Sequence, residues 1–364
     1  MTDVVLLGAG ASADAGVATS FEMTEAIARG IRRGSRRTSD RSDADLAEAF
    51  DYVCDRLHEL SSARGGSRYD VDVELVFSAV ELLAERESLE VAPFVAAWQS
   101  DVDHWRRRRS DDVFASLASH MLRELRHEIS VTRKEIRYLM SLVMAASDPG
   151  ELRIATLNYD RSIELAGKAC NVEVHTGIWE WVRAGRWTWP TTGVCLLKLH
   201  GSIDWTWHDD PPYEGRMPSR FVREIPTSAS DDDEPVLVFG LRGKLRAEGP
   251  FLSALAEFES WLASAQRLTV VGYSFRDDHV NQIIRRWTHD HRSREIIVVD
   301  PSLPRRRPTV TATSTFRNSL LTHLKPSGTS EGPETKIMVV RKRAAQAVPE
   351  LFGGGRAVRG ARSP

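Results

Sequence analysis

The stretch VVLLGAGASADAG, residues 4–16, decides the fold, because it joins a buried strand to a helix through a glycine-rich turn. Gly8, Gly10 and Ala13 fit the G-x-G-x-x-G/A pattern. In that pattern the first glycine makes the tight turn, and the second lets backbone N–H groups approach a pyrophosphate. Taken alone, the pattern also fits a turn that only joins a strand to a helix. The rest of the chain has to decide between these two interpretations.

Four more apolar runs end in polar or glycine-containing turns. They are LRIATLNYD (152–160), VCLLKLHGS (194–202), RLTVVGYS (267–274) and EIIVVDP (295–301). Helical sequence lies between the first two strands and again over 278–289, and it supplies the crossovers that parallel strands need. We therefore expect an α/β fold with a Rossmann-like, doubly wound parallel sheet. In such a sheet the ligand lies beyond the carboxyl ends of the strands.

The histidine that ends the third run, His200, has two interpretations. It is either a core histidine that bonds a nearby carbonyl or a catalytic group in a ligand cleft. The catalytic interpretation requires the other runs to end in a similar way, and all five do. It also suggests a reason for Gly201, because a side chain there would crowd the reacting groups.

The segment GIWEWVRAGRWTWP, residues 177–190, carries tryptophans at alternate positions. This spacing predicts a Trp-rich β-hairpin over about 176–192, with a three-residue loop at 183–185 and Gly185 in the left-handed conformation. The aromatic face can serve base stacking, or it can be a lid or packing surface over the cleft. No basic stripe alternates with the rings, which favours the lid or packing surface.

Two segments differ in composition and periodicity from the sheet-forming runs. Helical spacing over about 39–147 predicts a helical insertion, and the basic run 106–109 is flanked by aspartates, which favours a solvated helix face over a nucleic-acid patch. Residues 302–364 are rich in Pro, Gly and Arg, so we expect a largely flexible tail in which TKIMVVRK (335–342) can add one edge strand.

The composition of the chain excludes several classes of function. The chain has 364 residues, of which 41% are hydrophobic, and its net charge is -2, so no overall field draws it to nucleic acid or to an anionic membrane. Its three cysteines lie far apart without a CxxC pair, which argues against a disulfide framework and a four-cysteine zinc site. No apolar run reaches the roughly 18 residues of a membrane span. We expect a cytoplasmic protein that uses no metal.

Four motifs follow one another in the order and rough spacing of a known family: GAGAS (8–12), TLNYD (156–160), KLHGS (198–202) and GYSFRDDHVN (272–281). In these motifs the chain resembles the sirtuin-like NAD-consuming proteins of bacteria. It is more similar to their antiviral-defence branch than to the zinc-containing protein deacylases. The resemblance implies that residues 1–301 form a sirtuin-like NAD-binding catalytic domain, interrupted by the helical insertion.

The resemblance also implies which residues form the site. It assigns the catalytic roles to Asn158 and His200. The residues that it assigns to NAD binding are Gly8, Ala9, Gly10, Ala11, Ser12, Asp160, Gly272, Ser274 and Asp300. Gly8, Gly10 and Ser12 match the pyrophosphate loop, and Asp160 matches the side of the nicotinamide ribose. Gly272 and Ser274 match the adenosine side, with Asp300 a weaker match.

Two departures from the deacylases favour a different reaction. The chain lacks the four-cysteine module, and it reads GVATSFEM (16–23) where the deacylases have a phenylalanine-arginine pair. This leaves cleavage of the nicotinamide–ribose bond, the reaction of an NAD+ glycohydrolase. The pyridinium becomes neutral as it leaves, so the protein mainly has to stabilise an oxocarbenium-like ribose. We expect Asn158 to hold the ribose and a water, and His200 to act as the base.

Three alternatives stay open. The protein can be an NAD- or ADP-ribose-binding regulatory subunit without catalysis, an NAD-dependent protein deacylase, or a dehydrogenase. The region in which a dehydrogenase carries its acidic residue reads ARGIRRGSRR (28–37), which argues against the last. The resemblance further implies an abortive-infection anti-phage effector that uses NAD+ as substrate. Its control would come from homo-oligomerisation, a partner ATPase or a phage-derived trigger.

Overall fold

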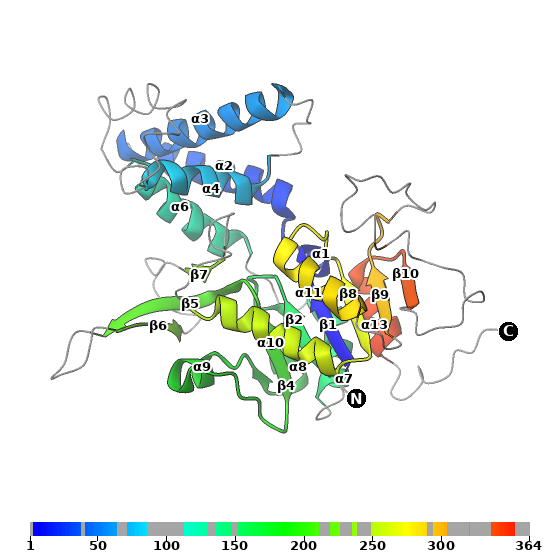
Figure 1. The fold of residues 1–364 in the computed structure, drawn as a ribbon. Helices are drawn as coiled ribbons and strands as arrows, with labels where there is room; N and C mark the ends of the chain where they lie inside the picture. The colour runs from blue at the N-terminus through cyan, green and yellow to red at the C-terminus, as the bar shows by residue number, and fades with distance from the viewer. Residues whose placement is uncertain are drawn as a thin grey trace.

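The computed structural model describes residues 3–37, 41–63, 71–85, 113–129, 135–147, 152–210, 219–225, 235–238, 249–289, 294–303, 320 and 336–353. Within these ranges, one sheet of seven strands forms the centre of the molecule (Figure 1). Its strands are β1 (Asp3–Leu7), β2 (Leu152–Thr156), β3 (Val174–His175), β4 (Val194–Lys198), β8 (Arg267–Val271), β9 (Glu295–Val299) and β10 (Lys336–Val340). All neighbours pair in parallel, in the order β10-β9-β8-β1-β2-β4-β3. The predicted parallel sheet is confirmed.

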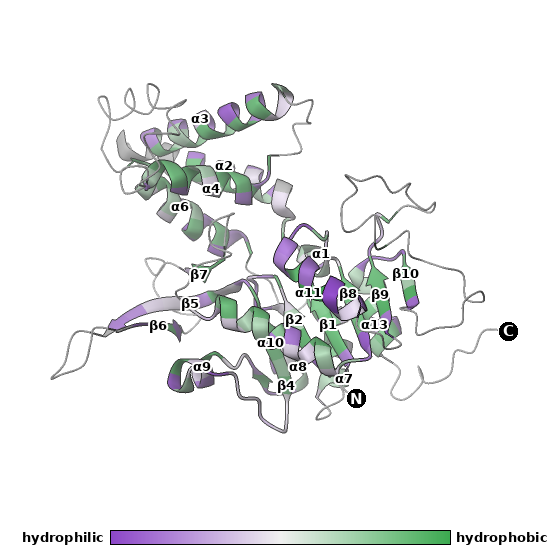
Figure 2. Ribbon diagram, viewed as in Figure 1, coloured by the Kyte–Doolittle hydropathy of each residue, from purple (hydrophilic) through white to green (hydrophobic). Residues whose placement is uncertain are grey.

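Helices cover both faces of this sheet, which explains why its strands read as uninterrupted apolar runs. The face of Val4 and Leu6 packs against α10 (Phe251–Ser264) and α11 (Asp278–His289). The face of Val5 and Leu7 packs against α7 (Met140–Ala146), α8 (Ser162–Cys170) and α13 (Ala344–Phe352). Figure 2 shows the central strands in the green of apolar residues. The doubly wound arrangement is thereby confirmed, and α11 spans the predicted crossover 278–289.

The strand order has a switch point at β1. From β1 the chain moves to β2 and then to β4 on one side, whereas β8 pairs with the other edge of β1. The turns that follow β1 and β8 therefore leave the sheet in different directions, and ligands bind at such a point in open α/β sheets.

Four helices form a separate layer above the carboxyl ends of these strands (Figure 1). They are α2 (Ser20–Arg37), α3 (Arg41–Ala63), α4 (Val73–Ala84) and α6 (Val113–Glu128), and we call them the helical module. The module begins earlier than the expected boundary at 39, because α2 belongs to it, and α7 packs on the sheet instead. The basic run 106–109 lies outside the described residues.

A second, antiparallel sheet lies beside the module. It consists of β5 (Gly201–Asp210), β6 (Ser219–Glu224) and β7 (Pro235–Leu237), in the order β6-β5-β7. Its core includes the fully buried Trp205 and Phe251 from the start of α10. This sheet is not predicted from the sequence, because the third apolar run ends at His200.

The predicted Trp-rich hairpin is wrong, because Ile178–Ala184 form a helix, α9. Ile178, Trp181 and Val182 are spaced i, i+3 and i+4, and they pack into the core of the second sheet. Gly185 is left-handed, as expected, with a φ of 65°, but it ends a helix and not a hairpin strand.

The tryptophans after α9 pack on α10. Trp187 Nε1 donates to Ser253 Oγ at 3.0 Å, and Trp189 Nε1 donates to Glu257 Oε1 at 2.8 Å. The rings of Trp187 and Trp189 stack on each other, with their centroids 5.9 Å apart. Neither ring lines the pocket that is described below, so they form a packing surface and not a lid.

The expectation of a largely flexible tail is wrong for residues 336–353. β10 is the predicted edge strand, and α13 follows it. Ala344, Ala347 and Val348 recur at helical spacing and are buried against the sheet, which orders the segment. Asp14 adds a polar contact, because its carboxylate accepts a hydrogen bond from Ala345 N at 2.9 Å. Residues 354–364 lie outside the described part.

Two features are absent from the described ranges. No helix there has the length and apolarity that a bilayer crossing requires. Nor do three or more His, Cys, Asp or Glu side chains gather there in a group that could hold a metal ion. The cysteines are separate thiols on α3, α8 and β4.

Candidate functional site

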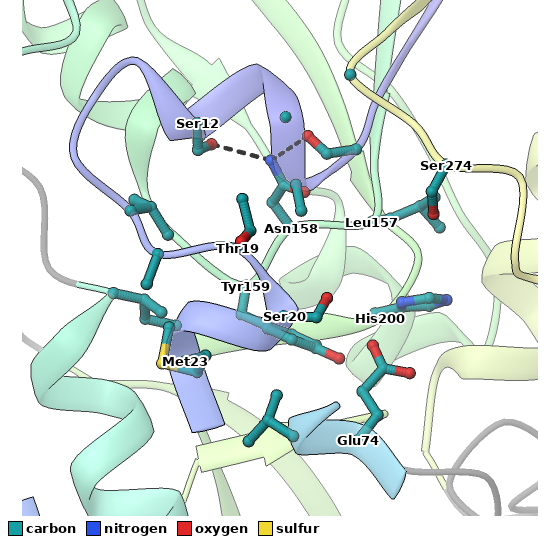
Figure 3. A pocket seen from close by; sticks show the side chains of 18 of the residues that line it. Ser12, Thr19, Ser20, Met23, Glu74, Leu157, Asn158, Tyr159, His200 and Ser274 are labelled. Carbon is teal, nitrogen blue, oxygen red and sulfur yellow. Dashed lines mark hydrogen bonds between the residues drawn. The ribbon is translucent and has the colours of Figure 1, made fainter. Parts of the chain in front are cut away.

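A pocket lies at the carboxyl ends of β1, β2, β4 and β8 (Figure 3). The turns after these strands form one side of it, and side chains of α2, α4 and the end of α6 form the facing wall. The predicted site residues that line it are Gly8, Ala9, Gly10, Ser12, Asn158, Asp160, His200, Gly272 and Ser274. The sheet thus brings together side chains from positions 8 to 274 at the predicted edge.

Two predicted binding residues do not line this pocket. The side chain of Ala11 is buried on the sheet, and its carbonyl accepts a hydrogen bond from Tyr138. Asp300 Oδ1 accepts hydrogen bonds from Ser302 N and Ser302 Oγ, each at 2.7 Å. The side chain of Asp300 therefore holds the turn after β9, and that of Ala11 contributes to the core.

The glycines after β1 and β8 let these two turns touch. Gly10 N donates to Gly272 O at 2.8 Å, and Gly8 N donates to Val271 O at 2.9 Å. A Cβ on Gly272 would lie 2.3 Å from Ala11 N, which is closer than any real contact of that kind. The N–H of Gly10 is thus bonded to the turn after β8, and Gly10 itself lines the pocket. Close packing of two backbones is what requires glycine here.

Gly272→Ala is expected to lower the free energy of unfolding by about 2 kcal/mol, because the methyl group would push the two turns apart. Gly185→Ala is the matched control, since Gly185 has a similar φ of 65° but no atom within 4 Å of the added Cβ. The control should cost only about 1 kcal/mol, the strain of the left-handed backbone. Urea denaturation of both variants measures the difference. Equal losses would show that the contact between the turns is unimportant.

Asn158 joins the turn after β2 to the turn after β1. Its Nδ2 donates to Gly8 O at 3.0 Å and to Ser12 Oγ at 2.9 Å (Figure 3). Both amide hydrogens are then used, and among the described residues no hydrogen bond reaches Asn158 Oδ1. This oxygen is the acceptor that Asn158 can offer to a ligand hydroxyl or to a water.

His200 is 8% exposed and borders the pocket. Its Nε2 lies 3.1 Å from Oδ2 of Asp277, a buried residue in the turn between β8 and α11. Within the described chain Nδ1 has no hydrogen bond. Asp277 is not among the site residues predicted from the sequence. An aspartate just before an apolar helix signals an N-cap, but this signal does not reveal a contact with a histidine 77 positions earlier.

The structure gives a different reason for the glycine at position 201 from the one expected. A Cβ on Gly201 would lie 2.2 Å from Val236 O on β7, and its φ is +87°. Glycine is therefore required by the backbone conformation and by the neighbouring strand, not by crowding of the reacting groups.

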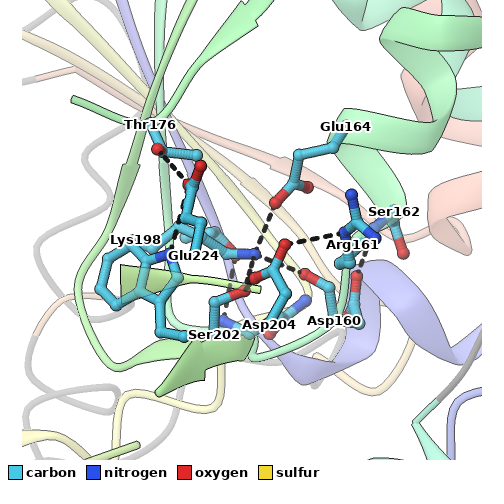
Figure 4. Close-up of polar contacts among 12 residues, drawn as sticks. Asp160, Arg161, Ser162, Glu164, Thr176, Lys198, Ser202, Asp204 and Glu224 are labelled. Atoms are coloured by element: carbon cyan, nitrogen blue, oxygen red, sulfur yellow. Dashed lines mark hydrogen bonds and ion pairs between the residues drawn. The ribbon is translucent and has the colours of Figure 1, made fainter. Parts of the chain in front are cut away.

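A buried lysine connects the segments of Asp160 and Ser202 (Figure 4). Lys198, the last residue of β4, is 1% exposed. Its Nζ donates to Asp160 O at 2.9 Å, to Glu164 Oε1 at 2.6 Å and to Ser202 Oγ at 2.6 Å. All three ammonium hydrogens thus have acceptors, on the segments that follow β2 and β4.

The carboxylates around Lys198 keep it charged. Burial lowers its pKa, but Glu164 and Asp204 raise it by more, so that the pKa lies above its usual value. Asp204 is in turn paired with Arg161, with Nε and Oδ2 2.9 Å apart. The Asp160 side chain is also fixed, because Oδ1 accepts from Ser162 N at 2.8 Å at the start of α8.

The helical module places two carboxyl groups at the pocket. Glu74 from the first turn of α4 points toward Tyr159 and His200 (Figure 3). Asp72, the N-cap of α4, forms an ion pair with Arg276, with Oδ2 and Nη1 2.9 Å apart, and so ties the module to the turn after β8. Burial and then Glu74 raise the pKa of Tyr159 well above its usual value. Tyr159 therefore stays protonated. Its hydroxyl donates to the backbone carbonyl of the residue that directly follows β7.

A family comparison covers part of this site. Residues 152–318 match the model of the SIR2-like domain. This part of the chain is similar to SIR2-like domains. The match includes the turns with Asn158, His200 and Gly272, whereas the turn after β1 lies outside it. No curated protein matches the chain.

Solved sirtuin structures are similar over most of the chain but at low identity. A Sir2 homologue in complex with NAD is 14% identical, with a TM-score of 0.40, and the alignment covers 97% of this chain and 88% of that one. A variant Sir2 homologue in complex with ADP-ribose is 13% identical, with a TM-score of 0.41 and coverages of 97% and 90%. Sir2Tm bound to a propionylated peptide is 11% identical, with a TM-score of 0.37 and coverages of 97% and 92%. At such values, the assignment of the fold rests on the strand order and register given above.

Proposed function

We propose that this protein is an NAD+ glycohydrolase, which cleaves the nicotinamide–ribose bond and yields nicotinamide and ADP-ribose. The observation that carries the proposal is the convergence of Asn158 and His200 on one pocket, beside the glycine turns of β1 and β8. A pocket at the switch point of a doubly wound sheet is where such folds bind nucleotides. The SIR2-like match of residues 152–318 agrees with NAD as the substrate.

The reaction needs few groups from the protein. As the C–N bond breaks, nicotinamide leaves as a neutral ring, and positive charge develops on the ribose. Asn158 Oδ1 would face this charge or hold the attacking water. The water oxygen bonds the anomeric carbon, and its proton passes to His200 and then to solvent. The apolar side chains of Met23, Leu125 and Ile129 on the facing wall suit a neutral leaving ring.

The helical module bears on the choice between hydrolase and deacylase. Its α2, α4 and α6 contribute a wall of the pocket, and the Asp72–Arg276 ion pair connects that wall to the sheet. This wall favours a small co-substrate such as water over a peptide bearing an acyl-lysine. On the sequence resemblance we extend the proposal to antiviral defence by NAD depletion, under the control of self-association, a partner ATPase or a phage-derived trigger.

Incubation of the purified protein with NAD tests the proposal. We expect equal amounts of nicotinamide and ADP-ribose by chromatography, and about a hundredfold slower release from Asn158→Ala. When the wild type and Asn158→Ala are each expressed in cells, only the wild type should lower the NAD concentration. Tight binding of ADP-ribose with intact NAD in both settings would point to a regulatory subunit without catalysis.

A further inference from the structure

The two carboxylate oxygens of Asp277 have different partners. Oδ1 accepts hydrogen bonds from His279 N at 2.9 Å and Val280 N at 3.1 Å, and so caps the start of α11. Oδ2 lies 3.1 Å from His200 Nε2. Asp277 is 4% exposed and lines the same pocket as His200. One side chain therefore connects a helix terminus to the candidate base.

We infer that Asp277 is a positioning residue that fixes His200 in the tautomer with its proton on Nε2, so that Nδ1 presents its lone pair to the pocket. The inference rests on the proposed function, since it names what prepares His200 as the base. An ionised carboxylate can only accept hydrogen bonds, so the histidine nitrogen that faces it must donate. The other imidazole nitrogen is then the one that can take a proton from water.

The turn that carries Asp277 is held rigidly, which positioning requires. Asp277 N donates to the hydroxyl of Tyr273 at 3.1 Å, and the same hydroxyl lies 3.1 Å from Asn281 Oδ1. Asn281 Nδ2 donates to Phe275 O at 2.9 Å, which secures a residue with a φ of 59°. A non-glycine residue keeps such a φ only where its surroundings enforce it. The carboxylate therefore has little freedom to leave His200.

Asp277→Asn distinguishes the role of Asp277 as the N-cap of α11 from its contact with His200. Asparagine caps helices as well as aspartate does, so α11 should start normally. An amide has only one acceptor oxygen, however, and the two backbone N–H groups of α11 occupy it. Its NH2 group then faces His200 Nε2, which must accept, and the imidazole proton moves to Nδ1. We expect kcat to fall by at least about tenfold, because the wrong tautomer faces the pocket.

Asp278→Asn is the matched control, since Asp278 is the exposed neighbour in the first turn of α11 and undergoes the same chemical change. A second variant, Asp277→Ser, retains a capping side chain but removes the oxygen beside His200. We expect both Asp277 variants to bind ADP-ribose with wild-type affinity by calorimetry and to melt near the wild-type temperature. Only kcat should distinguish them from Asp278→Asn.

The tautomer itself can be read without any turnover. In protein labelled with 15N-histidine, long-range 15N–1H correlations should assign the proton to Nε2 of His200 in the wild type and to Nδ1 in Asp277→Asn, with His200→Gln identifying the signal. An unchanged tautomer, or a loss of ADP-ribose binding equal to the loss of kcat, would overturn the inference. Absence of NAD cleavage by the wild type would instead reject the hydrolase, while the NMR result would still decide the role of Asp277.

Discussion

His200→Ala is expected to lower the turnover of NAD by about 10²–10⁴-fold, the range for removal of a positioned acid or base, while the melting temperature barely changes. The ring borders the pocket, so water can replace it beside Asp277 and spare the fold a large cost. Nicotinamide release by chromatography and melting by circular dichroism measure the two effects.

The matched control for this variant is His208→Ala. His208 lies on β5, is exposed, and does not line the pocket, so its turnover should equal that of the wild type. A large fall in melting temperature for His200→Ala, with activity lost only in proportion, would favour the interpretation of His200 as a core histidine.

Lys198→Met is expected to be the most destabilising of the substitutions considered, at about 3–5 kcal/mol. The substitution leaves the Glu164 carboxylate and Asp160 O without their shared donor in the interior, and an uncompensated buried charge is costly. Burial is the first cause that raises the pKa of Glu164, so this carboxyl would take up a proton when the lysine is absent. Urea denaturation measures the loss.

Two companion variants make this prediction specific. Lys168→Met, on the exposed side of α8, should be nearly neutral. Lys198→Met combined with Glu164→Gln should recover part of the loss, because the double variant no longer buries an unpaired carboxylate. Additive losses in the double variant would show that the ion pair contributes little to the stability of the protein.

Much of the sheet could be predicted from the sequence because its strands are buried on both faces and end in turns of recognisable composition. The runs at 152–160, 194–202 and 267–274 each lead from an apolar strand into a polar turn, and these turns meet in the pocket. Parallel strands bring their carboxyl ends to one edge, so the site followed from the fold class.

The predicted hairpin is wrong because two periodicities compete over residues 177–190. Trp179, Trp181, Trp187 and Trp189 alternate as in a strand, whereas the apolar set at 178, 181 and 182 has helical spacing. Burial of Ile178 and the caps at Gly177 and Gly185 favour the helix. Trp179, at 62% exposure, contributes to the alternation but not to the core.

The remaining site residues depend on contacts between distant parts of the chain. Asp277 and Asp278 look equivalent in the sequence, and only the turn after β8 directs the first toward His200. Glu74 reaches the pocket through the docking of the helical module, which no local pattern encodes. In the sequence, Lys198 only interrupts an apolar strand. Its role follows from the three acceptors that the fold brings to its ammonium group.

The most direct test of the central claim is the rate of nicotinamide release from NAD, measured with and without an acetyl-lysine peptide. We expect the same rate in both reactions, with ADP-ribose as the product and the peptide recovered unchanged. Release that requires the peptide, together with formation of acetyl-ADP-ribose, would contradict the hydrolase and identify a deacylase.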